Sequence, residues 1–146
     1  MESIKEPDLR FENNEVYRVS IKNLMNGSTF VYRIQNDFEN YTMIVKKNYK
    51  TGKGGDSIEK KSERTLLKSE WNNFQSQIHK SCFWTFPVRN LKEGGFDGSI
   101  WTLEANSPNS DNCTGRKFHA VVRWSPKKET EFYKLCNLLI EFDNEK

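Results

Sequence analysis

The stretch that decides the fold is SIWTLEANSPNSDNCTGRKFHAVVRW, residues 99–124. Residues 99–105 and 117–124 each alternate between two sets of side chains, and a period of two over this length predicts a β-strand. Residues 106–115 between them are rich in Asn, Ser, Asp and Gly, which are typical of turns. We therefore expect two antiparallel strands joined by a polar hairpin loop.

The alternation also assigns the side chains of these two strands to faces. In the first strand Trp101, Leu103 and Ala105 share one face. In the second strand the bulkier set is Phe118, Ala120, Val122 and Trp124. Large apolar side chains at this periodicity are usually buried, so we expect Trp101 and Trp124 in the core. Trp84, between Phe83 and Phe86, is expected to close the edge of the same core.

The opposite face is then predicted to carry a polar set, which consists of Thr102, Glu104, His119 and Arg123. Facing residues of antiparallel strands lie about 5 Å apart, so Glu104 and His119 are expected to be close. Such a group can hold an anion, or tune His119 as a proton carrier. The alternative is an ordinary solvated sheet face, on which charge pairs contribute little. The same face is expected to carry three apolar residues among these charges, namely Ile100, Val121 and Val31. Apolar residues at such positions suggest that a loop, a second subunit or a partner covers the face.

The rest of the chain predicts a three-stranded meander and two helices. Strands are expected over residues 15–24, 29–35 and 42–49, with Asn26-Gly27 in the first turn. The first helix is expected from Ser57 or Ser62 to His79, with an apolar stripe of Leu67, Trp71, Phe74 and Ile78. The second helix is expected to be capped by Ser125, with Pro126 at its first position and a stripe of Phe132, Leu135, Cys136, Leu139 and Phe142.

The predicted order βββ-α-ββ-α indicates an α+β fold. We expect a single antiparallel sheet of about five strands with both helices packed on one face. A length of 146 residues fits one domain over residues 1–146, with residues 1–14 as a loosely ordered N-terminal segment. The sequence does not set the strand order beyond the hairpin pairs.

Composition and charge exclude several classes of protein. No apolar run approaches the roughly 20 residues of a membrane-spanning helix, so we expect a soluble, cytoplasmic protein that does not bind membranes. An exported protein whose leader has been removed is the alternative. The net charge of +3 disfavours a nucleic-acid partner. The Lys- and Gly-rich residues 46–55 are expected to be a strand end and a solvated loop, because the spacing of a phosphate-binding loop is missing.

The three cysteines give no disulfide framework. Cys136 falls on the second helical stripe and is expected to be a buried thiol. A bridge between Cys82 and Cys113 is possible only in an exported protein. His79, Cys82, Cys113 and His119 contain no tight Cys-x2-Cys pair, so we predict no zinc site. No cofactor motif is present either, and we predict no cofactor.

Several motifs in residues 60–142 resemble a group of small uncharacterised bacterial domains. The likeness rests on a helical Trp, an FW pair, a DG..W.LE motif and an H.V.RW.P motif before the last helix, which correspond to Trp71, Phe83-Trp84, residues 97–104 and residues 119–126. The loop at residues 106–115 is longer than in that group. No activity is established for these domains, so the resemblance implies a single domain and no catalytic residues.

The leading hypothesis is a non-enzymatic interaction domain. It would bind a protein partner, or a second copy of itself, through the helix-free sheet face and the loops at residues 86–97 and 106–115. An immunity or inhibitor protein is one form, by analogy of size and charge alone. The alternative is a small hydrolase or ligand-binding protein centred on Glu104, His119 and Arg123. A catalytic site would require these three side chains to converge in a pocket, whereas an interaction face would be flatter.

Overall fold

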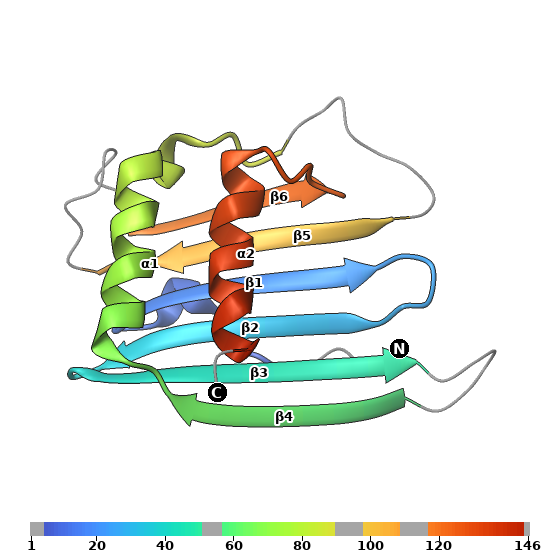
Figure 1. The fold of residues 1–146 in the computed structure, drawn as a ribbon, viewed down its shortest axis with the longest axis horizontal. Coiled ribbons are helices and arrows are strands. Elements are labelled where there is room, and N and C mark those ends of the chain that lie inside the picture. Colours follow the sequence, from blue (N-terminus) through green and yellow to red (C-terminus); the bar gives the residue numbers. More distant parts are fainter. Residues whose placement is uncertain (1–4, 51–56, 90–97, 109–116, 145–146) are drawn as a thin grey trace.

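The computed structural model describes residues 5–50, 57–89, 98–108 and 117–144. These residues form one six-stranded antiparallel sheet and two helices (Figure 1). The strands are β1 (Glu15–Asn23), β2 (Thr29–Asp37), β3 (Asn40–Lys50), β4 (Ser57–Thr65), β5 (Ser99–Asn106) and β6 (Phe118–Trp124). The helices are α1 (Lys68–Ser81) and α2 (Glu131–Asn144), with short 3-10 turns η1 (Leu9–Phe11) and η2 (Phe83–Thr85).

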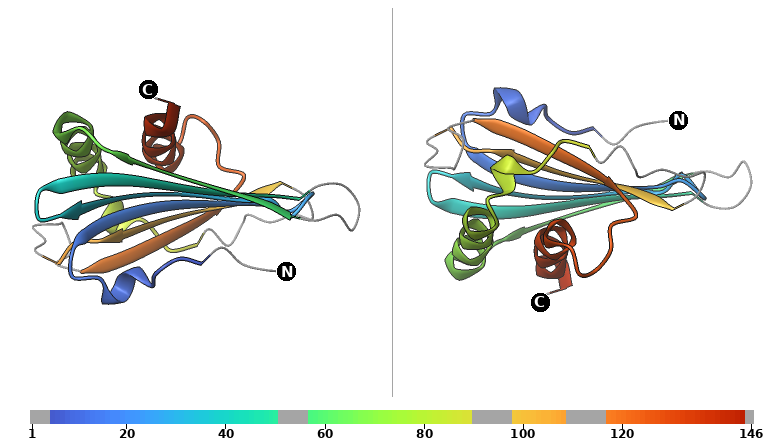
Figure 2. Two further views of the ribbon diagram at one scale, coloured as in Figure 1. Left: turned by 90° about the horizontal axis from the view of Figure 1, so that it is seen from below. Right: turned by 90° about the horizontal axis from the view of Figure 1, so that it is seen from above.

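The strand order is β4-β3-β2-β1-β5-β6. Strands β1 to β4 form a meander, and the chain then crosses by way of α1 to place β5 beside β1. Both helices lie on one face of the sheet, whereas residues 5–14 lie on the other face (Figure 2). The predicted α+β class, the antiparallel sheet and the shared helix face are confirmed, with one strand more than expected.

The core lies between the sheet and the two helices. The stripes predicted on the helices are buried there, apart from Leu67, which is exposed just before α1. Tyr17 of β1 links the layers, because its ring centroid lies 5.5 Å from that of Trp71 and 5.1 Å from that of Phe74. The Cys136 thiol is buried and free, and burial raises its pKa well above the ordinary value.

The first helix begins later than the sequence predicted, because residues 57–65 form β4 instead. Its sequence, SIEKKSERT, has no apolar stripe that could bury a helix against the sheet. Pairing with β3 satisfies the backbone of β4, and its mostly charged side chains remain exposed, as is common for an edge strand. Arg64 connects the strand to the helix, since it donates hydrogen bonds to Glu70 and to the carbonyl of Phe142.

The second helix also begins later, so the predicted cap at Ser125 is wrong. Ser125 has a positive φ of 39°, and its hydroxyl accepts a hydrogen bond from the backbone of Ser99 at 3.1 Å. Thr130 caps α2 instead, because its hydroxyl accepts from the backbone N–H of Tyr133 at 3.2 Å. Residues 125–130 therefore form a connection between β6 and α2.

The faces of β6 are the reverse of those predicted. Trp101 pairs with Arg123, Leu103 with Val121, and Ala105 with His119, so these residues lie on the helix face. Trp124 pairs with Ile100 and lies on the helix-free face. Trp101 packs against the core and Trp84 is buried in it, both as expected. Trp124 was wrongly placed because a strand of alternating bulky residues offers two phases, and the larger apolar set was not the buried one.

The two-residue turn between β2 and β3 places non-glycine residues in the left-handed region. Phe38 has φ 54° and Glu39 has φ 68°, the conformation that Asn-Gly adopts with least strain. Because the Phe38 side chain is 91% exposed, little packing would be lost on replacement. We expect the double substitution F38N/E39G to raise the free energy of unfolding by about 1 kcal/mol in urea titrations. Gly27→Ala, at φ 73°, is expected to lower it by a similar amount.

Candidate functional site

The residues predicted to form one polar patch lie on two sides of the sheet. Thr102 and Glu104 of β5 lie on the helix-free face, whereas His119 and Arg123 of β6 lie on the helix face. Glu104 is paired with Ala120, not with His119. The predicted grouping of Glu104, His119 and Arg123 is therefore wrong, and the physical cause is the reversed phase of β6.

His119 is part of the protein core. Its Nε2 atom lies 2.8 Å from the carbonyl oxygen of Phe86, and its ring packs at 5.3 Å from the ring of Phe83 and 6.3 Å from that of Trp84. The η2 segment therefore covers β6 and holds the imidazole away from solvent. This arrangement positions η2 on the sheet.

Arg123 contacts residues just after η2, near Val88. Its guanidinium donates hydrogen bonds to the carbonyls of Val88 and Val122, at 3.3 Å and 2.8 Å, and lies 5.8 Å from the ring centre of Phe132. The backbone N–H of Val122 also donates to Val88 at 2.7 Å. Arg123 thus joins β6, residues 86–88 and α2.

Glu104 forms an ion pair within the sheet. It lies directly opposite Arg18 of β1, whose guanidinium donates to both carboxylate oxygens at 2.8–3.1 Å. Both side chains are largely buried. The carboxylate that sequence reasoning assigned to a ligand is therefore already bound by a cation of the same chain.

The N-terminal segment, residues 5–14, crosses the helix-free face. Glu6 lies over three neighbouring strands and forms ion pairs with Arg18 of β1, Arg33 of β2 and Lys46 of β3. Leu9 of η1 is fully buried. Val31 is buried on this face, as is Ile44. The apolar residues predicted on this face suggested that something covers it. The N-terminal segment of the chain itself supplies at least part of this cover.

The pKa of the Glu6 carboxyl is shifted by two opposing effects. Burial raises the pKa, but hydrogen bonds from Lys46 and Arg33, with their positive charges, lower it by more. The net pKa is below the ordinary value of 4.5. A lowered pKa in the folded state means that the ionised form stabilises the fold.

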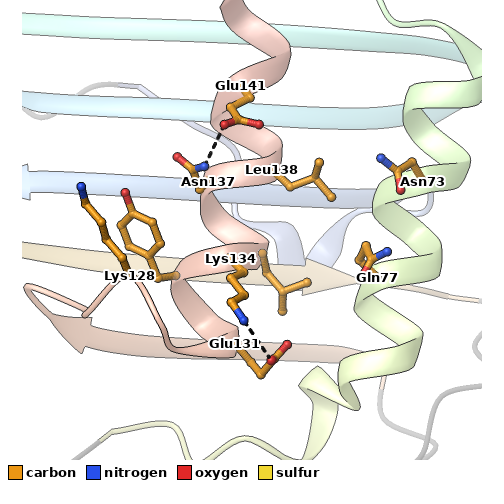
Figure 3. Close-up of a pocket in the computed structure, with 10 residues that line it drawn as sticks. Asn73, Gln77, Lys128, Glu131, Lys134, Asn137, Leu138 and Glu141 are labelled. Carbon is orange, nitrogen blue, oxygen red and sulfur yellow. Dashed lines mark hydrogen bonds and ion pairs between the residues drawn. The ribbon is translucent and has the colours of Figure 1, made fainter.

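A second surface feature is an open cleft of about 400 Å³ between α1 and α2 (Figure 3). Asn73 and Gln77 line it from α1, and Leu138 of α2 lies between the helices. The remaining lining residues come from α2 and the segment before it: Lys128, Glu131, Tyr133, Lys134, Leu135, Asn137 and Glu141.

The cleft combines an apolar part with polar groups of both charges. Asn137 donates to Glu141 at 3.0 Å, and Lys134 lies 3.7 Å from Glu131. The side chains of Asn73 and Gln77 are exposed, and neither amide forms a hydrogen bond with another described residue. Asn73 and Gln77 lie off the apolar stripe predicted for the first helix, but the sequence gave no signal that α2 would lie beside them.

Other expectations concern the cysteines, the loops and metal binding. Cys82 is disulfide-bonded at the end of α1, whereas Cys113 lies outside the described residues. Residues 90–97 and 109–115 of the two proposed binding loops also lie outside them. Within residues 5–50, 57–89, 98–108 and 117–144, no cluster of three His, Cys, Asp or Glu side chains can hold a metal ion, and no helix has the length and apolarity to cross a membrane.

Comparisons of the chain with protein-family models, curated proteins and solved structures found no match. The resemblance to small bacterial domains therefore stays a prediction.

The Glu6 ion pairs predict a pH dependence of stability. Because the pKa is lowered on folding, the stabilisation is present above pH 4.5 and is lost as the pH falls through the lower folded value. We expect Glu6→Gln to reduce the free energy of unfolding by about 2 kcal/mol at pH 7 and to flatten the acid limb of urea titrations between pH 5 and 2. The exposed Glu59→Gln variant should keep the wild-type profile. An unchanged acid limb in Glu6→Gln would contradict the assignment.

Proposed function

We propose that this protein is a non-enzymatic interaction domain that binds a segment of a protein partner in the cleft between α1 and α2. The observation that carries the proposal is the pair of uncommitted amides, Asn73 and Gln77, opposite Leu138 in an open cleft of about 400 Å³. Ligand sites in proteins commonly have this scale and a similar mixture of apolar surface and a few polar groups.

The lining groups suit a peptide better than an apolar small molecule. A carboxamide side chain offers both a donor and an acceptor, which match the C=O and N–H of an extended peptide. Leu135 and Leu138 can pack against one apolar side chain, while Glu131 and Lys128 at the rim can select for charge. Two helices present these groups on a rigid surface, so little order has to be gained on binding.

The position of the predicted patch residues also supports a binding role over a hydrolytic one. Glu104 is committed to Arg18, His119 to Phe86, and these two candidates are on opposite faces of the sheet. These residues therefore offer no shared hydrolytic centre, and the partner surface proposed for this function is the cleft. An immunity or inhibitor protein is one kind of domain that could use such a surface.

The disulfide at Cys82 supports a further part of the proposal, which is that the protein works in an oxidising compartment. Structural disulfides persist in exported proteins and are rare in the reducing cytosol. The sequence allowed export as the alternative to a cytoplasmic location, and the bonded state of Cys82 favours export.

The cleft can be tested with a phage-displayed library of random peptides. We expect enriched peptides to bind the wild-type protein and to lose at least tenfold in affinity, measured by fluorescence anisotropy, to Leu138→Arg or to the Asn73→Ala/Gln77→Ala double variant. Ser76→Arg, an exposed residue of α1 that does not line the cleft, is the matched control and should bind like wild type. Enriched peptides that bind Leu138→Arg and wild type equally would reject the cleft as the partner site.

The redox state of the cysteines can be measured by alkylation and mass spectrometry. We expect no rapid labelling of the native protein, since the Cys136 thiol is buried and Cys82 is bonded. One thiol should label in denaturant without reductant, and three after reduction, if Cys82 is bridged to Cys113 as the sequence allows. Three labelled thiols in denaturant alone, from protein purified out of an oxidising compartment, would reject the disulfide.

A further inference from the structure

Residues 5–9, which we call the strap, are bound to the helix-free face as a peptide ligand would be. Arg18 donates to the carbonyl of Pro7 at 2.7 Å, and Lys46 donates to the carbonyl of Lys5. Glu6 places its carboxylate among three cations, and Leu9 at the end of the strap is completely buried. The sheet thus contacts one acid, two backbone carbonyls and one leucine.

The strap is held by side chains and not by strand pairing. Among the described residues, its backbone makes no ladder hydrogen bonds with the sheet. The backbone–backbone bonds of η1 are internal ones at 3.2 Å, and the carbonyl of Arg10 accepts from the side chain of Lys117 at 3.4 Å. Phe11, just beyond the strap, is 77% exposed. Segments that share no strand ladder with a sheet open at lower free energy than its paired strands. Opening of the strap therefore requires the loss of its side-chain contacts and of the burial of Leu9, but not the loss of any strand pairing.

Hydrogen bonds from Asn106 to the chain just before β1 would limit how much of the N-terminal segment can detach. The side-chain amide of Asn106 is buried and donates to the carbonyls of Glu12 and Asn14, at 3.0 Å and 2.9 Å. These bonds fix the chain where it enters β1. Residues before Glu12 can then leave the face without disturbing the pairing of β1 with β2 and β5.

The charges beneath the strap define what can replace it. With the strap in place, Arg18, Arg33 and Lys46 face the carboxylates of Glu6 and Glu104. Without Glu6, Arg18 keeps the carboxylate of Glu104, whereas Arg33 and Lys46 lose the ion pairs that they make with Glu6. Three cations on adjacent strands give the vacated face a positive potential, which attracts an anion. The two backbone contacts and the site of Leu9 favour an anion that belongs to a peptide.

We propose that the helix-free face is a second peptide-binding site, which takes a protein segment of the form acid-Pro-x-Leu, and that the strap is its resident, displaceable ligand. The occupant in trans is a segment with the chemistry of residues 6–9 on a protein partner. This site is separate from the cleft between the helices, so the two proposals stand or fall independently. A tethered ligand has an effective concentration in the millimolar range, and this is why a free peptide competes poorly until the strap is weakened.

The test uses the full chain and a fluorescein-labelled peptide of residues 5–14, KEPDLRFENN. We expect the Glu6→Ala/Leu9→Ala double variant to bind this peptide at least tenfold more tightly than wild type does, measured by anisotropy. A peptide that carries the same two substitutions should bind neither protein. Asn13→Ala, a change at an exposed position between the strap and β1, is the matched control and should behave as wild type.

Two outcomes would overturn the proposal. The first is a double variant that keeps the wild-type far-ultraviolet circular dichroism and a cooperative melt but does not bind the peptide. The second is equal binding of the natural and substituted peptides. Should the double variant fail to fold, Glu6→Gln replaces it, with an expected gain of at least tenfold over wild type, and no gain would reject the site. A wild-type dimer that the peptide dissociates would support the site and identify a second copy as the source of the segment.

Discussion

The register between β1 and β5 is the constraint on which the rest of the structure depends. It places Tyr17 beside Ala105 and Val19 beside Leu103 on the helix face, where they form the floor of the core. The same register sets Arg18 opposite Glu104 on the other face. A shift of one residue would move every one of these side chains to the wrong side of the sheet. The core and the charged face are therefore fixed by a single pairing.

The sequence predicts this structure well where the side chains of a segment can be assigned to buried and exposed faces in only one way. It predicts the structure poorly where two such assignments, or phases, are equally plausible. The stripes of α1 and α2 are unambiguous, because their apolar residues fit only one side of a helix. Strand β6 fits two phases, and the deciding contacts come from residues 83–86, which no local pattern reveals. The exposed β4 shows neither period, so its strand pairing comes from β3. The predicted site was wrong because it grouped residues of β5 and β6 by their alternation alone, and the side chains of β6 face the opposite way.

The two faces of the sheet are stabilised by different interactions. On the helix face, apolar burial stabilises the fold, and the imidazole of the polar His119 contacts the carbonyl of Phe86 just after η2. On the helix-free face, cations from three adjacent strands depend on a carboxylate of the N-terminal segment. Removal of either cover would expose its face, but only the second cover is a short segment without ladder bonds. This difference makes the helix-free face the more adaptable surface.

The helix-free face carries buried ion pairs at positions where apolar side chains could also pack. A buried ion pair is often no more stabilising than apolar side chains of similar volume, because desolvation offsets the attraction. Val31 and Ile44 show that this face can bury apolar groups. Yet Arg18, Arg33 and Lys46 all form ion pairs with one carboxylate, and under the proposed exchange this arrangement would disfavour any segment that lacks an acid at that position. Such a cluster gains selectivity at a cost in stability, as expected of a surface that distinguishes one peptide from another.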